Sequence, residues 1–263
     1  MAPASNASQN QQQGRRVSAA SVRQSANHGP RFVRFSELDV ALVNRDLQIH
    51  TVSSDGEATI AQVLEQAHRL RLGEIAFTEH VRRTSDYFSR FAADVRAARH
   101  GSSVRVFVGL EAKAADASGM LDAPIEALAE AELVLGSVHR FPMDDGAFLA
   151  AENFSYEDAW GREFALSLAL LEQAPIHVLA HPGGMCQRAF GRFPDAQMRM
   201  LMRTALQRGV AIEINSKYTR DLDAFLALCR EINPIVSIGS DAHRLEDLGT
   251  CRDALRARGI GVR

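Results

Sequence analysis

The sequence predicts an α/β fold in which seven parallel strands close into a barrel, and two observations predict it. First, seven short apolar runs rich in β-branched residues alternate with segments of helical periodicity, as in a parallel sheet with helical crossovers. Second, polar residues of the kind that carry chemistry follow nearly every run. In a barrel the C-terminal ends of such strands converge on one pocket, so closure into a barrel is favoured over an open sheet.

The chain divides into an N-terminal tail and one domain, predicted as residues 1–35 and 36–263. The tail is rich in Ser, Ala, Asn and Gln, cannot build a core and is expected to be disordered. It contains several arginines but no acidic residue before Glu37, which resembles a transit peptide weakly. Because it lacks an amphipathic apolar face, a plain disordered tail is the favoured interpretation.

Each predicted strand is short and is followed by polar residues. In chain order the runs are Val40–Val43, Ile75–Phe77, Val104–Leu110, Leu133–Val138, Ile176–Ala180, Val210–Ile214 and Ile235–Ile238. Between them, apolar residues recur at a spacing of three and four, which predicts amphipathic helices. The clearest sets are Ile60–Ala67, Met198–Leu206 with Gly209 as its stop, and Leu222–Cys229.

Composition indicates an ordinary globular protein with one sizeable core, since 46% of the 263 residues are hydrophobic and 24% are charged. The formal net charge of −2 gives no general attraction to nucleic acid or anionic membranes. No apolar run approaches the ~18 residues of a membrane span, and the N-terminus lacks a secretory apolar region. Cys186, Cys229 and Cys251 are widely spaced, so reduced thiols and a cytoplasmic location are expected.

Imidazoles and carboxylates dominate the residues that follow the runs. The segments are Asp46-Leu47-Gln48-Ile49-His50-Thr51, Thr78-Glu79-His80, Gly109-Leu110-Glu111, Ser137-Val138-His139-Arg140, Ala180-His181-Pro182, Glu213-Ile214-Asn215 and Ser240-Asp241-Ala242-His243. A single histidine at a strand end is most often a hydrogen-bonded structural residue. Here five of the nine histidines follow strands, and so many ionisable groups in one pocket are costly unless something compensates.

Divalent metal ions are the expected compensation, because neutral imidazole and carboxylate are their ordinary ligands. The candidate ligands number about seven to nine, which is more than one tetrahedral or five-coordinate ion uses. Two or three ions are therefore predicted. A carboxylate commonly bridges two cations ~3.5–4 Å apart, and Glu111 is central in the order, so it is the expected bridge.

Together these segments resemble the polymerase and histidinol phosphatase (PHP) family. The matching motifs are Asp-Leu-x-x-His-Thr with Ser-Asp-Gly, Thr-Glu-His, Gly-Leu-Glu, Ser-Val-His, Ala-His-Pro-Gly and Ser-Asp-Ala-His. They span residues 45 to about 250, and six in this order, each after a predicted strand, are specific although each alone is weak. The resemblance implies a PHP-type domain over residues 36–263: a distorted (β/α)7 TIM-like barrel whose trinuclear active site, at the C-terminal ends of the strands, holds zinc, manganese or iron.

The resemblance also implies how the ligands are shared. The first ion takes Gln48, His50, Glu111 and Asp241, the second shares Glu111 and adds His139 and His181, and the third takes Asp55, His80 and His243. Asp55 has a second possible role, as the N-cap of a helix over Thr59–Leu72.

Gln48 departs from the family pattern, which usually has histidine at that position. A neutral amide oxygen is a poorer ligand than imidazole for a transition metal, so the first ion is expected to bind more weakly or to exchange. Glutamine also occurs in this motif in the related domains of bacterial X-family polymerases, so the change alone does not imply an inactive site. The alternative is a lost metal and a non-catalytic scaffold.

The expected chemistry is hydrolysis of a phosphate ester by a metal-activated water, with basic groups neutralising the phosphoryl oxygens. Glu111, Lys113 and Arg140 are the candidate catalytic residues, since the two basic residues follow Glu111 and His139 closely. Arg82 and Arg83 are more simply interpreted as surface charge, and Ser216 and Lys217 are further candidates for the pocket lining.

A small phosphorylated metabolite is the favoured substrate, because the chain has no polymerase domain and no large basic surface. The alternative is a nuclease or nucleotide phosphodiesterase, which the same metals support, although no basic, aromatic-rich stretch for binding a strand is present. A non-enzymatic binding module is favoured only if Gln48 prevents metal loading. No membrane association is expected, and the sequence leaves the oligomeric state open.

Overall fold

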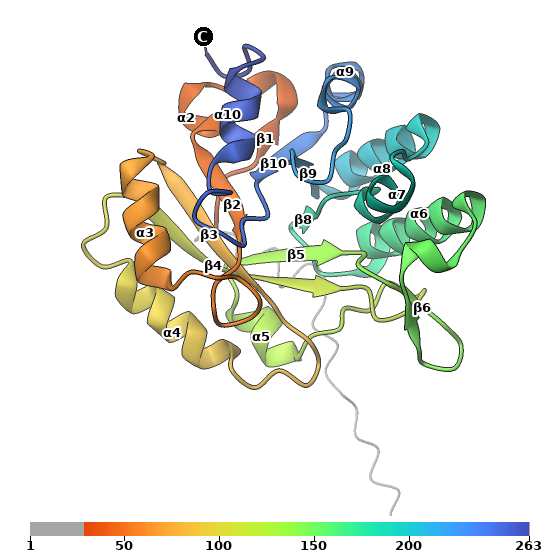
Figure 1. The fold of residues 1–263 in the computed structure, drawn as a ribbon, viewed down its shortest axis with the longest axis horizontal. Coiled ribbons are helices and arrows are strands. Elements are labelled where there is room, and N and C mark those ends of the chain that lie inside the picture. Colours follow the sequence, from red (N-terminus) through yellow and green to blue (C-terminus); the bar gives the residue numbers. More distant parts are fainter. Residues whose placement is uncertain (1–28, 263) are drawn as a thin grey trace, which may run out of the picture.

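The computed structural model describes residues 29–262, whose strands form one mainly parallel sheet of eight strands and one short two-stranded hairpin (Figure 1). The large sheet contains β1 (Val33–Arg34), β2 (Arg45–Ile49), β3 (Glu74–His80), β4 (Arg105–Lys113), β5 (Leu133–Ser137), β8 (Val178–Leu179), β9 (Ala211–Asn215) and β10 (Ile235–Gly239). The hairpin is formed by β6 (Phe141–Pro142) and β7 (Phe148–Leu149). From β2 to β10, strands of the large sheet lie beside their neighbours in chain order, as a β/α barrel requires.

The sheet closes where the end of β2 meets the residues after β10. The backbone N–H of His50 donates to the carbonyl of Ala242 at 2.9 Å, and the N–H of Ala242 donates to the carbonyl of Gln48 at 3.1 Å. At the other end of β10, β1 pairs antiparallel through Val33 and Val236. The seven parallel strands therefore form a distorted barrel that is closed at the C-terminal strand ends, and the predicted fold class is confirmed.

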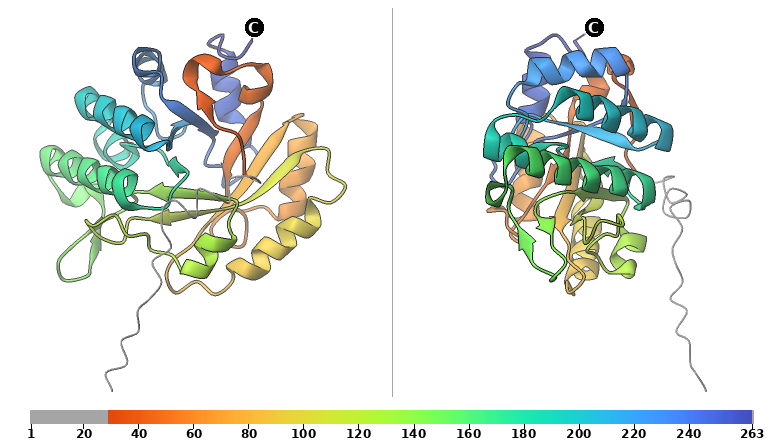
Figure 2. Two further views of the ribbon diagram at one scale, coloured as in Figure 1. Left: turned by 180° about the vertical axis from the view of Figure 1, so that it is seen from behind. Right: turned by 90° about the vertical axis from the view of Figure 1, so that its right-hand side faces the viewer.

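Helices surround the outside of the sheet (Figures 1 and 2). They are α2 (Val40–Val43), α3 (Ile60–Arg69), α4 (Phe88–Ala98), α5 (Ile125–Glu130), α6 (Tyr156–Gln173), α7 (Gly184–Phe190), α8 (Asp195–Arg208), α9 (Leu222–Ile232) and α10 (Thr250–Arg256), with 3-10 turns η2 (Phe35–Glu37) and η3 (Ala151–Asn153). The three predicted helical segments lie in α3, α8 and α9, and α8 ends at Gly209 with φ 68°, as predicted. No described helix has the length and apolar character that crossing a bilayer requires.

Two predicted segments are corrected by the structure. Val40–Val43 is helix α2 and not a strand, because the carboxylate of Asp39 accepts a hydrogen bond from the N–H of Leu42 at 2.7 Å and caps a helical turn. The first parallel strand begins instead at Arg45. Within the stretch assigned to the tail, Val33–Arg34 is strand β1, so the folded domain begins before residue 36. The rest of the predicted tail, residues 1–28, lies outside the described residues.

The barrel interior is apolar at one end and polar at the other. Alternate residues of a strand share one face, so Phe107, Gly109 and Glu111 of β4 all point inward. Phe107 belongs to an inner apolar cluster that also contains Leu47, Ala76, Leu133, Leu135, Val178, Ala180 and Ala211. Glu111 lies two inner positions further along, at the polar end. The alternation therefore places a dry core beneath the residues that follow the strands.

β2 departs from this alternation. Its register against β3 shifts between Asp46 and Ile49, which marks a bulge. Leu47 packs in the inner apolar cluster, yet the side chain of Gln48 also reaches across the barrel and hydrogen-bonds Asn215 of β9. Ile49 packs in the outer core. The bulge thus turns two consecutive side chains inward and brings Gln48 and His50 onto the face that carries the polar residues.

Candidate metal centre

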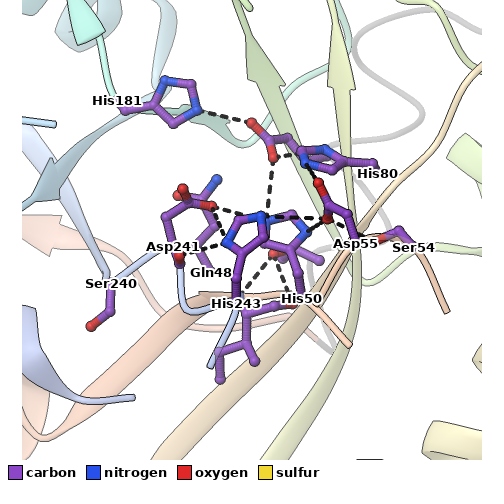
Figure 3. Close-up of polar contacts among 12 residues, drawn as sticks. Gln48, His50, Ser54, Asp55, His80, His181, Ser240, Asp241 and His243 are labelled. Atoms are coloured by element: carbon purple, nitrogen blue, oxygen red, sulfur yellow. Dashed lines mark hydrogen bonds and ion pairs between the residues drawn. The ribbon is translucent and has the colours of Figure 1, made fainter. Parts of the chain in front are cut away.

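The polar side chains that follow the strands gather around one cavity at the C-terminal end of the barrel (Figure 3). The cavity has a volume of about 520 Å³. Its lining includes six of the nine predicted metal ligands, namely Asp55, His80, Glu111, His139, Asp241 and His243. His50 and His181 lie behind them, 1% and 3% exposed, and touch the same carboxylates. Gln48 is the exception and is described below.

Glu111 is the centre of the cluster and is itself 1% exposed. Its Oε1 lies 3.0 Å from the Nε2 atoms of both His139 and His181. Its Oε2 lies 3.2 Å from Nδ1 of His80 and 3.5 Å from Nε2 of His50. One carboxylate therefore faces four imidazoles from four different strand ends, which is the position predicted for a bridging ligand.

Asp55 and Asp241 complete the outer side of the cluster. Asp55 lies 3.3 Å from Nε2 of His80 and 3.4 Å from Nε2 of His243. Asp241 Oδ1 lies 3.0 Å from Nε2 of His50. Asp55 is thus among the imidazoles, and the alternative role as a helix cap is wrong, because helix α3 begins at Ile60 and is capped by Thr59 in a capping box with Gln62.

Several buried atoms of this cluster have polar neighbours but make no well-directed hydrogen bond among the described residues. They are both ring nitrogens of His50 and Oε2 of Glu111. The Nε2 atoms of His139 and His181 lie 3.2 Å apart and face the same carboxylate oxygen. Buried polar atoms are almost always satisfied, so atoms that converge without partners indicate an absent ligand. Nitrogen and carboxylate donors in this mixture fit a divalent metal.

The ligand atoms fall into three overlapping groups whose members lie within 4.8 Å of one another. The groups are His50 with Asp55, His80 and His243, then His80 with Glu111 and His139, and finally His50 with Glu111 and Asp241. These groups resemble the three predicted ligand sets, but His50 and His80 each belong to two of them and His181 belongs to none. How the residues are shared between ions stays a prediction.

The carboxylates of the cluster favour positive charge on two of the imidazoles around them. Burial lowers the pKa of His80, but the carboxylates of Glu111 and Asp55 outweigh burial and raise the pKa to about 10. His181 is likewise raised to about 9, because contact with Glu111 outweighs its burial. Burial alone raises the pKa of Glu111, yet the surrounding imidazoles hold it well below its ordinary value. The site therefore attracts positive charge strongly.

Gln48 is fully buried, and its side chain faces Asn215 of β9. Its Oε1 accepts a hydrogen bond from Nδ2 of Asn215 at 3.3 Å, and its Nε2 has no partner among the described residues. One lone pair of the amide oxygen is therefore engaged by the protein. This observation agrees with the expectation that Gln48 is the weakest of the predicted ligands.

Basic side chains surround the cavity on several sides. Lys113 and Arg140, the predicted catalytic cations, both line it, and so do Arg82 and Lys217. The Nζ of Lys113 lies 3.4 Å from the centre of the Phe148 ring, and burial lowers its pKa. Lys217 Nζ donates to Asp241 Oδ2 at 3.1 Å. Arg83 and Ser216 are not among the lining residues, and Arg83 turns toward Met120.

Three buried acids next to the ligands were not predicted as site residues. Asp46 accepts from the N–H groups of Ser240 at 2.9 Å and Gly249 at 2.8 Å, which ties β2 to the segment after β10. Glu79 accepts from the N–H of Thr51 at 2.9 Å and from the hydroxyl of Ser54, and so holds the turn that carries Asp55. Asp46 and Glu79 both lie inside motifs that the sequence analysis identified, close to a predicted ligand. Their position in those motifs is the only feature of the sequence that could have indicated their supporting role.

Glu213 is the third such acid, and it supports His181. His181 has φ +28°, which is unusual for a residue with a side chain, and its N–H donates to Oε2 of Glu213 at 2.7 Å. Burial raises the pKa of Glu213 to about 8. Asp241 also has a positive φ, +49°. Two predicted ligands thus keep strained backbone conformations, as residues at functional sites often do.

Comparison with known proteins agrees with this geometry. The PHP domain model matches residues 46–217, more than half of the chain. The probable phosphatase of Syntrophotalea carbinolica is 27% identical over 229 residues, covering 82% of this chain and 88% of the relative. The probable phosphatase of Caldicellulosiruptor saccharolyticus is 27% identical over 216 residues, covering 77% and 81%.

Solved structures support the same fold. The histidinol phosphate phosphatase of Lactococcus lactis, determined with zinc, L-histidinol and phosphate, superposes with a TM-score of 0.60 at 16% identity and covers 83% of this chain and 94% of its own. The hisK protein of Listeria monocytogenes has a TM-score of 0.61 at 15% identity, covering 78% of this chain and 97% of its own. Similarity at this identity shows the fold alone. With the motif order, the matched residues and the barrel in agreement, the chain belongs to the PHP domain family.

Proposed function

We propose that the protein is a metal-dependent phosphoesterase that hydrolyses a small phosphomonoester with an activated water. The observation that carries the proposal is the convergence of His50, His80, His139 and His181 on the Glu111 carboxylate, with buried atoms that lack partners. The two relatives named as probable phosphatases match this chain over most of its length, which supports the same class of reaction.

Two or three divalent ions, of zinc, manganese or iron, would be held by the predicted ligands His50, Asp55, His80, Glu111, His139, His181, Asp241 and His243, with Gln48 at most a weak addition. Such ions supply activation of water near neutral pH and neutralisation of charge on phosphoryl oxygens. Their chemistry suits the donor set, because imidazoles and carboxylates bind all three metals.

The protein's own side chains would bind and orient the phosphate. Lys113 and Arg140 lie on the wall of the cavity, and their cationic groups would neutralise non-bridging oxygens of the ester. The lowered pKa of Lys113 reflects partial burial, which strengthens its interaction with an anion. The volume of the cavity, about 520 Å³, suits a small substrate better than a nucleic acid duplex. A cytoplasmic location is part of the same proposal.

The proposal is tested by metal analysis combined with two model substrates. The full chain is loaded with Mn²⁺ or Zn²⁺, its metal content is measured, and the release of p-nitrophenol is compared for p-nitrophenyl phosphate and bis-p-nitrophenyl phosphate. Metal uptake with preferential cleavage of the monoester supports the proposal. Preferential cleavage of the diester would favour a nuclease or nucleotide phosphodiesterase, and a protein that takes up no metal and cleaves neither ester would be a scaffold.

A further inference from the structure

A second, smaller cavity adjoins the metal centre. It has a volume of about 290 Å³ and is lined by Arg188, Lys217, Tyr218 and Arg220. The first three of these residues also line the main cavity, so the two cavities share a wall. Three of the four lining residues are cationic and none is acidic. The smaller cavity is therefore suited to an anionic group that extends from the metal centre.

The two arginines of this cavity carry charge that the protein does not neutralise. Arg188 and Arg220 are exposed, and neither forms an ion pair with a carboxylate among residues 29–262. Some other arginines do form such pairs, for example Arg99 with Glu132 at 2.8 Å. Lys217 differs from its neighbours, because its Nζ already contacts Asp241 at 3.1 Å. In the smaller cavity, the guanidinium groups of Arg188 and Arg220 are therefore the cations available to bind an anionic ligand.

The arginines come from different elements that are fixed against each other. Arg188 belongs to α7, and Arg220 follows β9. Gln187 is 8% exposed, and its Oε1 accepts a hydrogen bond from the N–H of Arg220 at 2.9 Å. Tyr218 packs on the ring of His181 with centroids 4.6 Å apart. The backbone beneath both arginines is thus held in a defined position relative to a predicted metal ligand.

Glycine allows this close arrangement. A Cβ on Gly184 would lie 3.1 Å from Cδ1 of Tyr218, so a larger residue at the start of α7 would require the tyrosine ring to move by a few tenths of an ångström. The ring lines both cavities, as Arg188 does, whereas Arg220 lines only the smaller one. A ligand that reaches from one cavity to the other would pass over Tyr218 and Lys217, which line both.

We propose that Arg188 and Arg220 bind a second phosphate group of the substrate, so that the protein acts on small molecules that carry two phosphates. The inference rests on the proposed function, since the first phosphate would lie at the metal cluster. A phosphomonoester carries about −1.5 to −2 charges and three acceptor oxygens at pH 7, and two planar guanidinium forks match that group better than a single charge. The unpaired arginines supply both the charge and the donors.

The test uses substrates that differ only in the second anion. The full chain, loaded with Mn²⁺, is assayed for phosphate release from alkanediol monophosphates, the matching bisphosphates, and ω-carboxyalkyl phosphates with spacers of three to six carbons. We expect kcat/KM for the best bisphosphate to exceed that for its monophosphate at least about tenfold, mainly through KM, as one strong charge-assisted contact provides. A larger gain with the carboxylate would overturn the assignment to phosphate.

Substitutions of the two arginines test whether they cause the preference for bisphosphates over monophosphates. Arg220→Ala and Arg188→Ala should each lower kcat/KM for the bisphosphate more than for the monophosphate, so that the ratio falls toward one. Arg192→Ala is the matched control, because Arg192 packs over the ring of Tyr156 at 4.1 Å and lines neither cavity. It should keep the wild-type ratio. A ratio that survives in both cavity variants would overturn the subsite.

Failure of the subsite and failure of the proposed function give different results. Hydrolysis of monophosphates without any bisphosphate preference overturns the subsite and leaves the phosphoesterase intact. If no ester is hydrolysed, binding decides separately: alkane bisphosphonates and monophosphonates are titrated calorimetrically into the metal-loaded protein. Tighter binding of the bisphosphonate that is lost in Arg220→Ala supports the subsite without reference to turnover, and equal binding overturns it.

Discussion

Gln48 lies where the PHP family usually has histidine, and the surroundings of its side chain explain why glutamine is tolerated there. The amide is fully buried, and its oxygen accepts from Asn215, whose Nδ2 also lies 3.3 Å from Glu213. Glutamine is therefore satisfied on one side by the protein itself. Its Nε2 remains without a partner among the described residues, which leaves one side of the cluster poorly matched to a cation.

Replacing this residue with histidine should strengthen metal binding. An imidazole at position 48 offers a better nitrogen ligand than a neutral amide oxygen, so Gln48→His should tighten the binding of the weakest ion by about tenfold or more. Competition with a chelator of known affinity measures the change. Gln207→His, an exposed position on α8, is the matched control and should leave affinity unaltered. Equal or weaker binding in Gln48→His would refute the ligand role of this position.

Glu111 and His139 are the residues whose loss should stop turnover with the least effect on the fold. Glu111→Gln removes the charge that faces four imidazoles, and His139→Ala removes one of the nitrogens beside it. Either change should lower the rate more than about 100-fold, beyond the usual loss from a supporting residue. Circular dichroism should show retained secondary structure.

A matched change elsewhere in the same cavity provides the comparison. Glu152 lines the cavity but makes no contact with an imidazole among the described residues. Glu152→Gln should therefore change the rate by less than about threefold, as for a surface substitution. An undiminished rate in Glu111→Gln or His139→Ala would count against the assignment of the metal centre.

At the scale of elements, β10 supports the ligands at one position, where Gly239 lies directly against the side chain of Glu213 on β9. A Cβ on Gly239 of β10 would lie 2.1 Å from Oε1 of Glu213 and 2.8 Å from Cβ of Gln48. Glu213 in turn holds the strained backbone of His181 after β8. Glycine at this position thus leaves room for the acid that fixes a ligand on a third strand.

Gly239→Ala should therefore destabilise the protein and weaken the metal site together. Overpacking a well-packed interior costs about 1–3 kcal/mol, and displacement of Glu213 would also leave the N–H of His181 without its acceptor. Urea unfolding and metal titration of the same sample measure both effects. Gly161→Ala in helix α6 meets no atom within 4 Å and should instead stabilise by about 0.5–1 kcal/mol. A neutral Gly239→Ala would contradict the packing argument.

The elements also show what periodicity can and cannot predict. Six of the predicted strands were found because they are fully buried apolar runs, and the amphipathic helices α3, α8 and α9 were found from their spacing. Val40–Val43 was misassigned, since four apolar residues fit a strand or a helical turn equally and only the cap by Asp39 decides. Strand β1 was not predicted, because a strand of two residues is too short to show an alternation of apolar and polar residues.

At the scale of the whole molecule, the order of the motifs in the sequence predicts that the candidate ligands lie together at the C-terminal ends of the strands. Imidazoles from five strand ends converge because barrel closure brings those ends together, which no local pattern encodes. Predictions failed to identify the supporting acids Asp46, Glu79 and Glu213. Their role depends on backbone N–H groups far away in the sequence, such as Gly249 and His181, and those contacts follow only from tertiary packing.

The metal-free molecule should lose stability as the pH rises, and metal should abolish that loss. The pKa values of His80 and His181 are raised to about 10 and about 9, so between pH 6.5 and 10 the folded state binds more protons than the unfolded state. Their stabilising charge is fully present below the unfolded pKa and disappears as the pH passes the folded values. Glu213, with a pKa raised to about 8, changes stability in the same direction below pH 8.

Urea unfolding at pH 7, 8 and 9 with a chelator, and again with bound metal, measures this dependence. The midpoint of the metal-free protein should fall with pH, whereas bound ions replace the protons and keep the loaded protein stable, and they should be released as activity falls below about pH 6. His80→Gln should flatten the metal-free dependence, and His100→Gln, at an exposed position, should leave it unchanged. A metal-free protein that is more stable at pH 9 than at pH 7 would show that the imidazoles do not stand in for cations, and an acid optimum of the loaded enzyme would show that they are not its ligands.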